Sequence, residues 1–185
     1  MTVTVDGRMS VHINVPISET LFEFNVPNLP IVSKVHNIKP VLDARAFKCC
    51  VLSRMIEAKR PMLVVGQINS CHDRIEEALE TIGKHVTVLS EPLSSGTQQL
   101  ADLAIASIDN DNVADYSPDF LLYVGDTVVS KRLKRFLRDA NIAEVWGVSR
   151  DGEVYDTFMC QAGVGQCRHV EALLAFSADL VEIED

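Results

Sequence analysis

From residue 41 onward, short apolar runs alternate with amphipathic segments, and this alternation limits the fold more than any other feature of the sequence. Four apolar runs have the length of buried strands: residues 62–65, 86–89, 120–124 and 142–148. Between them, apolar residues recur at helical spacing, as at Ile75, Ala78, Leu79 and Ile82. Strands that alternate with helices in this way predict an α/β fold: a three-layer, Rossmann-like domain with a mostly parallel sheet flanked by helices.

Two segments are expected to depart from the alternation. Asp151-Gly152 is a turn signal typical of β-hairpins, and it predicts that Glu153–Phe158 runs antiparallel to the strand before it. The polar segment Asp109–Ser117 is predicted to be a surface loop, which follows a helix at about Thr97–Ser107. We therefore expect the sheet to be mostly, rather than wholly, parallel.

The first forty residues lack the alternation. A short strand is predicted at Val11–Val15, and prolines follow it at positions 16, 27, 30 and 40. Proline fixes φ and removes a backbone donor, so this stretch should be extended. Because a strand without neighbours cannot satisfy its backbone groups, we expect it either to join the edge of the following sheet or to end a preceding domain, in a chain that is a fragment of a longer protein. In the second case, the end of that domain would be residues 1–20, followed by a proline-containing linker at 21–40 and the α/β domain at 41–185.

Charge and hydropathy argue against several classes of protein. A net charge of −9 disfavours general nucleic-acid binding, which needs a basic surface. No apolar run approaches the ~20 residues that span a bilayer, and the N-terminus lacks the layout of a signal peptide. We expect a cytoplasmic protein with no membrane span and no nucleic-acid partner.

The motifs of several catalytic and cofactor sites are missing from the chain. No Gly-x-Gly-x-x-Gly sequence joins a strand to a helix, and no Walker-type phosphate loop is present. The five histidines are scattered and the five cysteines show no Cys-x-x-Cys spacing, so neither a metal site nor a disulfide framework is predicted. The cysteines are expected to be buried free thiols. We assign no catalytic, cofactor-binding or metal-binding residue to this chain.

The apolar run at 120–124 leads into a strongly basic helix. Five of the seventeen basic residues of the chain lie within the eight positions 131–138. Ser130 is a favourable N-cap, since its hydroxyl can accept a hydrogen bond from a free backbone N–H of the first turn. One side of the helix is an apolar stripe that should be buried, formed by Leu133, Phe136, Leu137 and Ala140. Three basic residues are expected only to face solvent on the opposite side: Lys134, Arg135 and Arg138.

Lys131 and Arg132 occupy the first turn of this helix, where the helix dipole favours acidic residues over cations. The turns after parallel strands collect at one edge of a sheet, where ligands of α/β proteins bind, so Ser130 and the two cations should lie on that edge. An anion bound at the helix start would compensate the cations. The alternative is that both side chains merely extend into solvent.

Several motifs of the chain resemble those of one enzyme family. They are His12-Ile-Asn-Val-Pro-Ile-Ser-Glu-Thr-Leu-Phe, Leu63-Val-Val-Gly, Glu91-Pro-Leu-Ser and, most specifically, Tyr123-Val-Gly-Asp-Thr-Val-Val-Ser-Lys-Arg-Leu. Together with Trp146 and Asp156, they resemble the middle of the 2-succinyl-5-enolpyruvyl-6-hydroxy-3-cyclohexene-1-carboxylate synthases of menaquinone biosynthesis. The resemblance covers nearly the whole chain but only part of such an enzyme.

Enzymes that this chain resembles use thiamine diphosphate and Mg²⁺ and consist of a pyrimidine-binding, a central and a diphosphate-binding domain. The resemblance implies that residues 1–20 end the first domain and that 41–185 form the central one. It further implies a transferase that decarboxylates 2-oxoglutarate and adds the succinyl unit to isochorismate, with Lys131 and Arg132 holding substrate carboxylates. The activating glutamate and the magnesium ligands would lie outside this chain. The chain alone is therefore expected to bind no cofactor and to be inactive, and the full-length enzyme to be a homo-oligomer.

Two other functions are compatible with the sequence. The chain could be a stand-alone α/β module that binds an anionic metabolite or nucleotide. It could also be a docking domain whose basic helix contacts an acidic partner, and such an association would depend strongly on salt.

Overall fold

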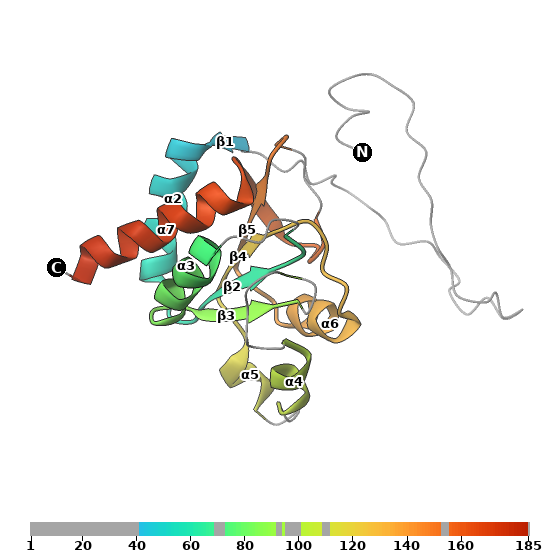
Figure 1. Ribbon diagram of the computed structural model, residues 1–185. Helices are drawn as coiled ribbons and strands as arrows, with labels where there is room; N and C mark the ends of the chain where they lie inside the picture. The colour runs from blue at the N-terminus through green and yellow to red at the C-terminus, as the bar shows by residue number, and fades with distance from the viewer. Residues whose placement is uncertain are drawn as a thin grey trace, which may run out of the picture. The chain divides into compact units, whose positions relative to one another are not determined.

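The computed structural model describes residues 41–68, 73–91, 94, 101–108, 112–152 and 156–184 (Figure 1). The strand predicted at Val11–Val15 and the domain boundaries at residues 20 and 40 lie outside these ranges, so they stay predictions. The start of the helix predicted at Thr97–Ser107 also lies outside them, up to residue 100. Within the described ranges, no helix has both the length and the apolar character needed to cross a bilayer.

The described residues form one six-stranded sheet in which every pair of neighbouring strands is parallel, which confirms the predicted α/β class. In sheet order the strands are β1 (Val41–Asp43), β6 (Gln161–Gln166), β5 (Glu144–Ser149), β4 (Phe120–Val124), β2 (Pro61–Val65) and β3 (Thr87–Ser90). Because all strands run the same way, their carboxyl ends form a single edge of the sheet. The strand order reverses between β2 and β4, and ligands of open α/β sheets bind beside such a reversal.

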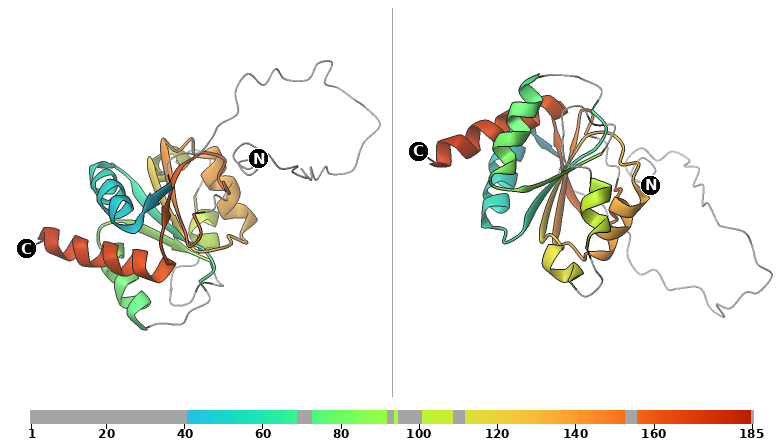
Figure 2. Two further views of the ribbon diagram at one scale, coloured as in Figure 1. Left: turned by 90° about the horizontal axis from the view of Figure 1, so that it is seen from above. Right: turned by 60° about the horizontal axis from the view of Figure 1, so that its bottom comes forward.

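Helices cover both faces of the sheet and give the predicted three layers (Figure 2). One face carries α2 (Ala44–Glu57), α3 (Asp73–Gly83) and α7 (His169–Glu184), and the other carries α4 (Ala101–Ala106) and α6 (Lys131–Asp139). The short helix α5 (Val113–Tyr116) precedes β4. It forms inside the segment that the sequence predicts to be a loop, Asp109–Ser117, so that prediction is wrong for these four residues.

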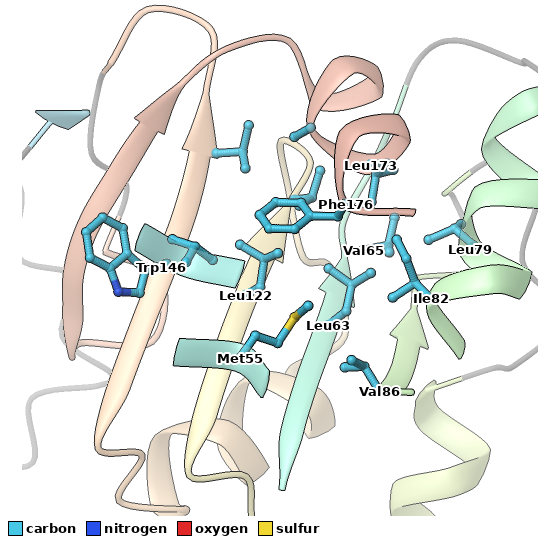
Figure 3. Packing of buried hydrophobic residues seen from close by; sticks show 14 of the residues in the cluster. Met55, Leu63, Val65, Leu79, Ile82, Val86, Leu122, Trp146, Leu173 and Phe176 are labelled. Atoms are coloured by element: carbon cyan, nitrogen blue, oxygen red, sulfur yellow. The ribbon is translucent and has the colours of Figure 1, made fainter. Parts of the chain in front are cut away.

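Alternate residues of each strand point to opposite faces and so join two separate hydrophobic clusters. Leu63 and Val65 pack with Met55 and Phe176 on the side of α2 and α7 (Figure 3). Their neighbours in β2 pack with residues of α4 and α6 on the opposite side, in a cluster that includes Met62, Val64, Leu121, Leu133 and Leu137. Since the central strands are buried on both faces, they read in the sequence as continuous apolar runs.

Strand β6 differs from the prediction. Gln161–Gln166 pairs in parallel with β5, with Val164 opposite Gly147, so the strand that pairs with β5 after the Asp151-Gly152 turn is parallel to it and not antiparallel as predicted. The described end of that segment, from residue 156, is a turn. Gly152 does adopt the positive φ of a turn, +73°, but the chain then continues for several residues before it enters the sheet.

The composition of β6 explains why it is hard to recognise. Its sequence, Gln-Ala-Gly-Val-Gly-Gln, has a single large apolar side chain. At Gly165 the space beside the backbone is filled by the Phe47 ring of α2, whose carbons lie 2.3–2.5 Å from the place where a Cβ would stand. The ring packs on the strand only because the strand lacks a side chain there.

The described cysteines are free, as predicted, but they are not buried. Cys49 and Cys160 are exposed, while Cys50 and Cys167 are half-buried. Cys71 lies outside the described residues.

Candidate functional site

The loops after β2 and β4 hold one another at the carboxyl edge of the sheet. Three backbone hydrogen bonds join them: Gly66 N to Val124 O (2.9 Å), Gln67 N to Thr127 O (3.0 Å) and Asp126 N to Gln67 O (2.9 Å). Gly125 has φ +120°, and a Cβ at this position would lie 2.8 Å from the carbonyl carbon of Gly66. Glycine is therefore required both for the backbone conformation and for the close approach of the two loops. The loop that leads to α6 is thus fixed in place.

Tyr123 supports this loop from within the sheet. Its hydroxyl donates a hydrogen bond to the backbone oxygen of Asp126 at 2.6 Å, and its ring packs edge-on against Phe158, with ring centroids 5.4 Å apart. Burial raises the pKa of the Tyr123 hydroxyl, and the charges of Asp126 and Glu91 raise it further. The hydroxyl therefore stays protonated and continues to donate at any ordinary pH.

Helix α6 begins with the cap that the sequence predicts. The Ser130 hydroxyl accepts a hydrogen bond from the backbone N–H of Leu133 at 3.0 Å. At the other end of the helix, Asn141 adopts a left-handed conformation with φ +50°, which is a common way to terminate a helix. Leu133, Phe136 and Leu137 are buried as the predicted apolar stripe requires.

Two acidic residues contact the start of α6, and we call Glu91, Asp102 and Ser130 the first-turn network. Glu91 is 2% exposed, and its carboxylate accepts a hydrogen bond from the backbone N–H of Ser130 at 2.9 Å. The Ser130 hydroxyl donates to the carboxylate of Asp102 on α4. The helix dipole and the two first-turn cations favour acidic groups at this place, and the chain supplies two of them itself.

Glu91 also fixes the ends of two strands. Its backbone N–H donates to Val65 O at 3.0 Å, and the backbone N–H and hydroxyl of Ser94 both donate to its backbone oxygen, at 2.9 and 2.7 Å. One residue thus joins the end of β2, the end of β3 and the start of α6. The first turn of α6 is consequently held by the sheet and not only by its own cap.

Lys131 and Arg132 are both exposed at this fixed turn. The Arg132 guanidinium donates to the backbone oxygen of Asp102 at 3.3 Å and lines a hollow of about 210 Å³ together with Ile105, Ile108, Arg135 and Phe136. Neither cation forms an ion pair with a residue that the structure describes. Their charge is therefore available to a ligand, and their role in substrate binding stays a prediction.

A second group of cations lies along α6, in a hollow that we call the basic cleft. It has a volume of about 610 Å³ and lies at the carboxyl ends of β4 and β5. Its charged and polar lining residues are Asp126, Thr127, Lys134, Arg138, Ser149, Arg150, Asp151, Thr157, Gln161 and His169. Lys134 and Arg138 thus do more than face solvent, which corrects the sequence interpretation. Arg135 is exposed, pairs with Asp139 at 3.7 Å and lines the smaller hollow beside Arg132 rather than the basic cleft.

The described residues offer no group of three or more His, Cys, Asp or Glu side chains that could hold a metal ion. Where α7 begins, His169 Nε2 lies 4.0 Å from the Asp126 carboxylate, a pair that is ionic only when the imidazole is protonated. This contact joins the β4–α6 loop to α7 at one end of the basic cleft.

Sequence reasoning missed Glu91, Asp102 and Arg150. Glu91 belongs to the Glu91-Pro-Leu-Ser motif of the sequence analysis, but its contact with Ser130 joins residues that are 39 positions apart. Asp102 and Ser130 are 28 positions apart. No local pattern signals such contacts, because they depend on how α4 and α6 pack on the same face of the sheet.

The chain is similar in sequence to curated enzymes that share one name. It is 32% identical over 157 residues to the 2-succinyl-5-enolpyruvyl-6-hydroxy-3-cyclohexene-1-carboxylate synthase of Bacteroides thetaiotaomicron, a match that covers 82% of the chain and 28% of that enzyme. The identity to the synthase of Phocaeicola vulgatus is 32% over 185 residues, covering 95% of the chain and 33% of the enzyme. The identity to the synthase of Flavobacterium johnsoniae is 28% over 156 residues, covering 80% of the chain and 28% of that enzyme. No family model matches the chain.

Proposed function

We propose that this chain, which is homologous to one segment of the 2-succinyl-5-enolpyruvyl-6-hydroxy-3-cyclohexene-1-carboxylate synthases, is the central domain of such an enzyme. It spans 28–33% of the length of these relatives, which is the share expected of one domain among three. Residues 41–185 would be the central domain, 21–40 a linker and 1–20 the end of the pyrimidine-binding domain. The full-length protein would be a cytoplasmic homo-oligomer.

The proposed activity of the full-length protein is that of a transferase in menaquinone biosynthesis. It would decarboxylate 2-oxoglutarate and add the succinyl unit to isochorismate. Thiamine diphosphate with Mg²⁺ would supply the decarboxylation chemistry. By the resemblance to the synthases, the residues that hold both would lie in the other domains.

Within this enzyme, Lys131 and Arg132 would bind substrate carboxylates. The observation that supports this role is the fixed first turn of α6. Both cations are exposed on this turn and form no ion pair with a described residue. Arginine and lysine are suited to carboxylate recognition. A turn that is held by Ser130 and Glu91 presents them without the entropic cost of ordering a loop.

The assignment is tested with the full-length protein that contains this chain, by calorimetry with isochorismate and by steady-state kinetics. A charge-assisted hydrogen bond contributes about 1.5–3 kcal/mol, so Lys131→Ala and Arg132→Ala should each weaken kcat/KM or substrate affinity by about 10- to 100-fold. Lys84→Ala removes an exposed charge that lines neither hollow; it is the control and should change either quantity by less than about 2-fold. Unchanged affinity and turnover in both first-turn variants would remove the two residues from the site.

The 185-residue chain by itself should be inactive, since the proposed cofactor-binding residues lie outside it. The purified chain is assayed with 2-oxoglutarate, isochorismate, thiamine diphosphate and Mg²⁺, and no consumption of 2-oxoglutarate is expected. Measurable turnover would mean that the chain holds catalytic groups of its own and would contradict the proposal.

A second candidate function is a module that binds an anionic metabolite or nucleotide. The basic cleft favours it, because this hollow is large enough for a small molecule. The two functions are compatible within one protein, since Lys131 and Arg132 are not among the cleft's lining residues.

A further inference from the structure

The basic cleft has two walls and a floor that the chain itself forms. One wall is α6, which contributes Lys134 and Arg138. The other is formed by described residues from the two ends of the β5–β6 connection, Arg150 and Asp151 at its start and Thr157 near its end. The floor is the sheet, where Gly147 and other residues of β5 and β6 lie under the opening.

Contacts across the cleft keep its two walls together. Arg138 donates from Nε and from a terminal nitrogen to the backbone oxygen of Thr157, at 3.0 and 2.8 Å. Behind this contact, the Phe158 ring packs against Tyr123 in the core. The two walls are therefore joined where the Arg138 guanidinium contacts the Thr157 backbone.

Gly147 lies in the floor of the basic cleft and contributes no side chain to it. A Cβ at this position would lie 2.4 Å from the side-chain nitrogen of Gln161. That nitrogen donates instead to the backbone oxygen of Gly163 at 3.2 Å. A side chain at this position would therefore meet the Gln161 amide, which also lines the basic cleft.

The charges of the cleft favour an anion. Three permanent cations line it, Lys134, Arg138 and Arg150, against two carboxylates, Asp126 and Asp151. This excess of positive charge is local, because the chain as a whole carries a net charge of −9. Of the carboxylates, Asp126 lies beside His169, at 4.0 Å. Lys134 and Arg150 form no ion pair with a described residue.

We propose that the basic cleft is a binding site for a small molecule with several anionic oxygens, carried on phosphate or carboxylate groups. Lys134 and Arg150 contact these oxygens from opposite walls, and the Thr127 and Ser149 hydroxyls are further donors at the carboxyl ends of the strands. This site is distinct from the first turn of α6. It requires no assumption about the reaction of the full-length enzyme.

Binding is measured on the 185-residue chain by titration calorimetry with three probes, pyrophosphate, citrate and ADP, at about 0.15 M salt, where the Debye length is about 8 Å. At least one probe should bind. The double variant Lys134→Ala/Arg150→Ala should weaken that binding by about 10-fold or more, because charge-assisted hydrogen bonds are lost on both walls. Citrate and pyrophosphate binding alike would identify a general oxyanion site, and a clear preference for ADP would identify a nucleotide site.

The matched control is Lys84→Ala/Arg135→Ala, which removes the same charge from two exposed positions outside the cleft. It should weaken binding by less than about 2-fold, since the lost charges are screened. In the unchanged chain, NMR titration should shift the amide signals of residues 125–128 and 149–151, which needs no variant. No binding of any probe at millimolar concentration, equal weakening in both double variants, or shifts confined to the first turn of α6 would each overturn the proposal.

Discussion

Two strips of the α6 surface carry cations in different settings. By helical spacing, positions 131, 134 and 138 form one strip of the helix surface, and positions 132, 135 and 139 form the strip beside it. On the first strip, Lys134 and Arg138 line the basic cleft. On the second, Arg132 donates to the backbone of α4 and Arg135 pairs with an aspartate of its own helix.

The difference teaches that a run of basic residues is not a single functional surface. The residues that hold the helix start are acidic or neutral, namely Glu91, Asp102 and Ser130. The cations are therefore free for other roles, and their roles differ with the direction in which they point. Variants of the first-turn network should lower stability, whereas variants of Lys131, Arg132 and Lys134 should change binding while leaving stability nearly the same.

The largest expected effect on stability is that of Glu91→Ala. The change removes the acceptor of the Ser130 N–H within a buried setting, and an unsatisfied buried donor costs about 1–3 kcal/mol in free energy of unfolding. Urea denaturation of the chain measures the loss. Glu91→Gln keeps an acceptor oxygen and should lose clearly less. If Glu91→Ala and Lys134→Ala had the same free energy of unfolding, it would be wrong that the first-turn network stabilises the fold while the cations do not.

A smaller loss is expected for Ser130→Ala. The substitution removes the cap of α6 and the hydrogen bond to Asp102, and a lost N-cap costs about 0.5–2 kcal/mol. Because Asp102→Ala removes one of the same two bonds, the double variant should lose less than the sum of the single variants. Ser53→Ala, on the exposed side of α2, is the control and should stay within about 0.5 kcal/mol of the unchanged chain. Additive losses would show that the Ser130 and Asp102 side chains do not interact.

The parts of this arrangement that could be predicted from the sequence are those that local patterns determine. The apolar runs predict the central strands, because residues buried on both faces must all be apolar. The N-cap of α6 could be predicted from Ser130, since the acceptor hydroxyl and the donor N–H of Leu133 are only three residues apart. The position of the cations at the carboxyl edge then follows from the parallel sheet.

The remaining features depend on contacts between distant residues. Strand β6 is formed by a sequence with little apolar character, and its place in the sheet depends on Phe47, which packs where Gly165 lacks a side chain. The turn at Gly152 is real, but a turn does not determine whether the next strand returns beside the last one or crosses over to lie parallel to it. In the same way, Arg150 lines the basic cleft together with Lys134 only because α6 packs beside the carboxyl ends of β4 and β5.

The smallest effect concerns Arg138, which differs from the other cations because it both lines the basic cleft and holds its walls together. Arg138→Ala removes two hydrogen bonds to Thr157 O, and because these bonds are solvent-exposed we expect a loss of only about 0.5–1 kcal/mol in free energy of unfolding. The effect should be local and visible as faster amide hydrogen exchange at Met159 and Gln161, which follow the contact in sequence. Arg135→Ala, three residues away on the neighbouring strip of the helix, should leave the exchange rates unchanged and the free energy of unfolding within about 0.5 kcal/mol, as expected for an exposed ion pair. Faster exchange in both variants would mean that α6 as a whole has loosened and that the two strips of the helix do not act independently. Faster exchange in Arg138→Ala alone would show that one strip of α6 supports the cleft while the other does not.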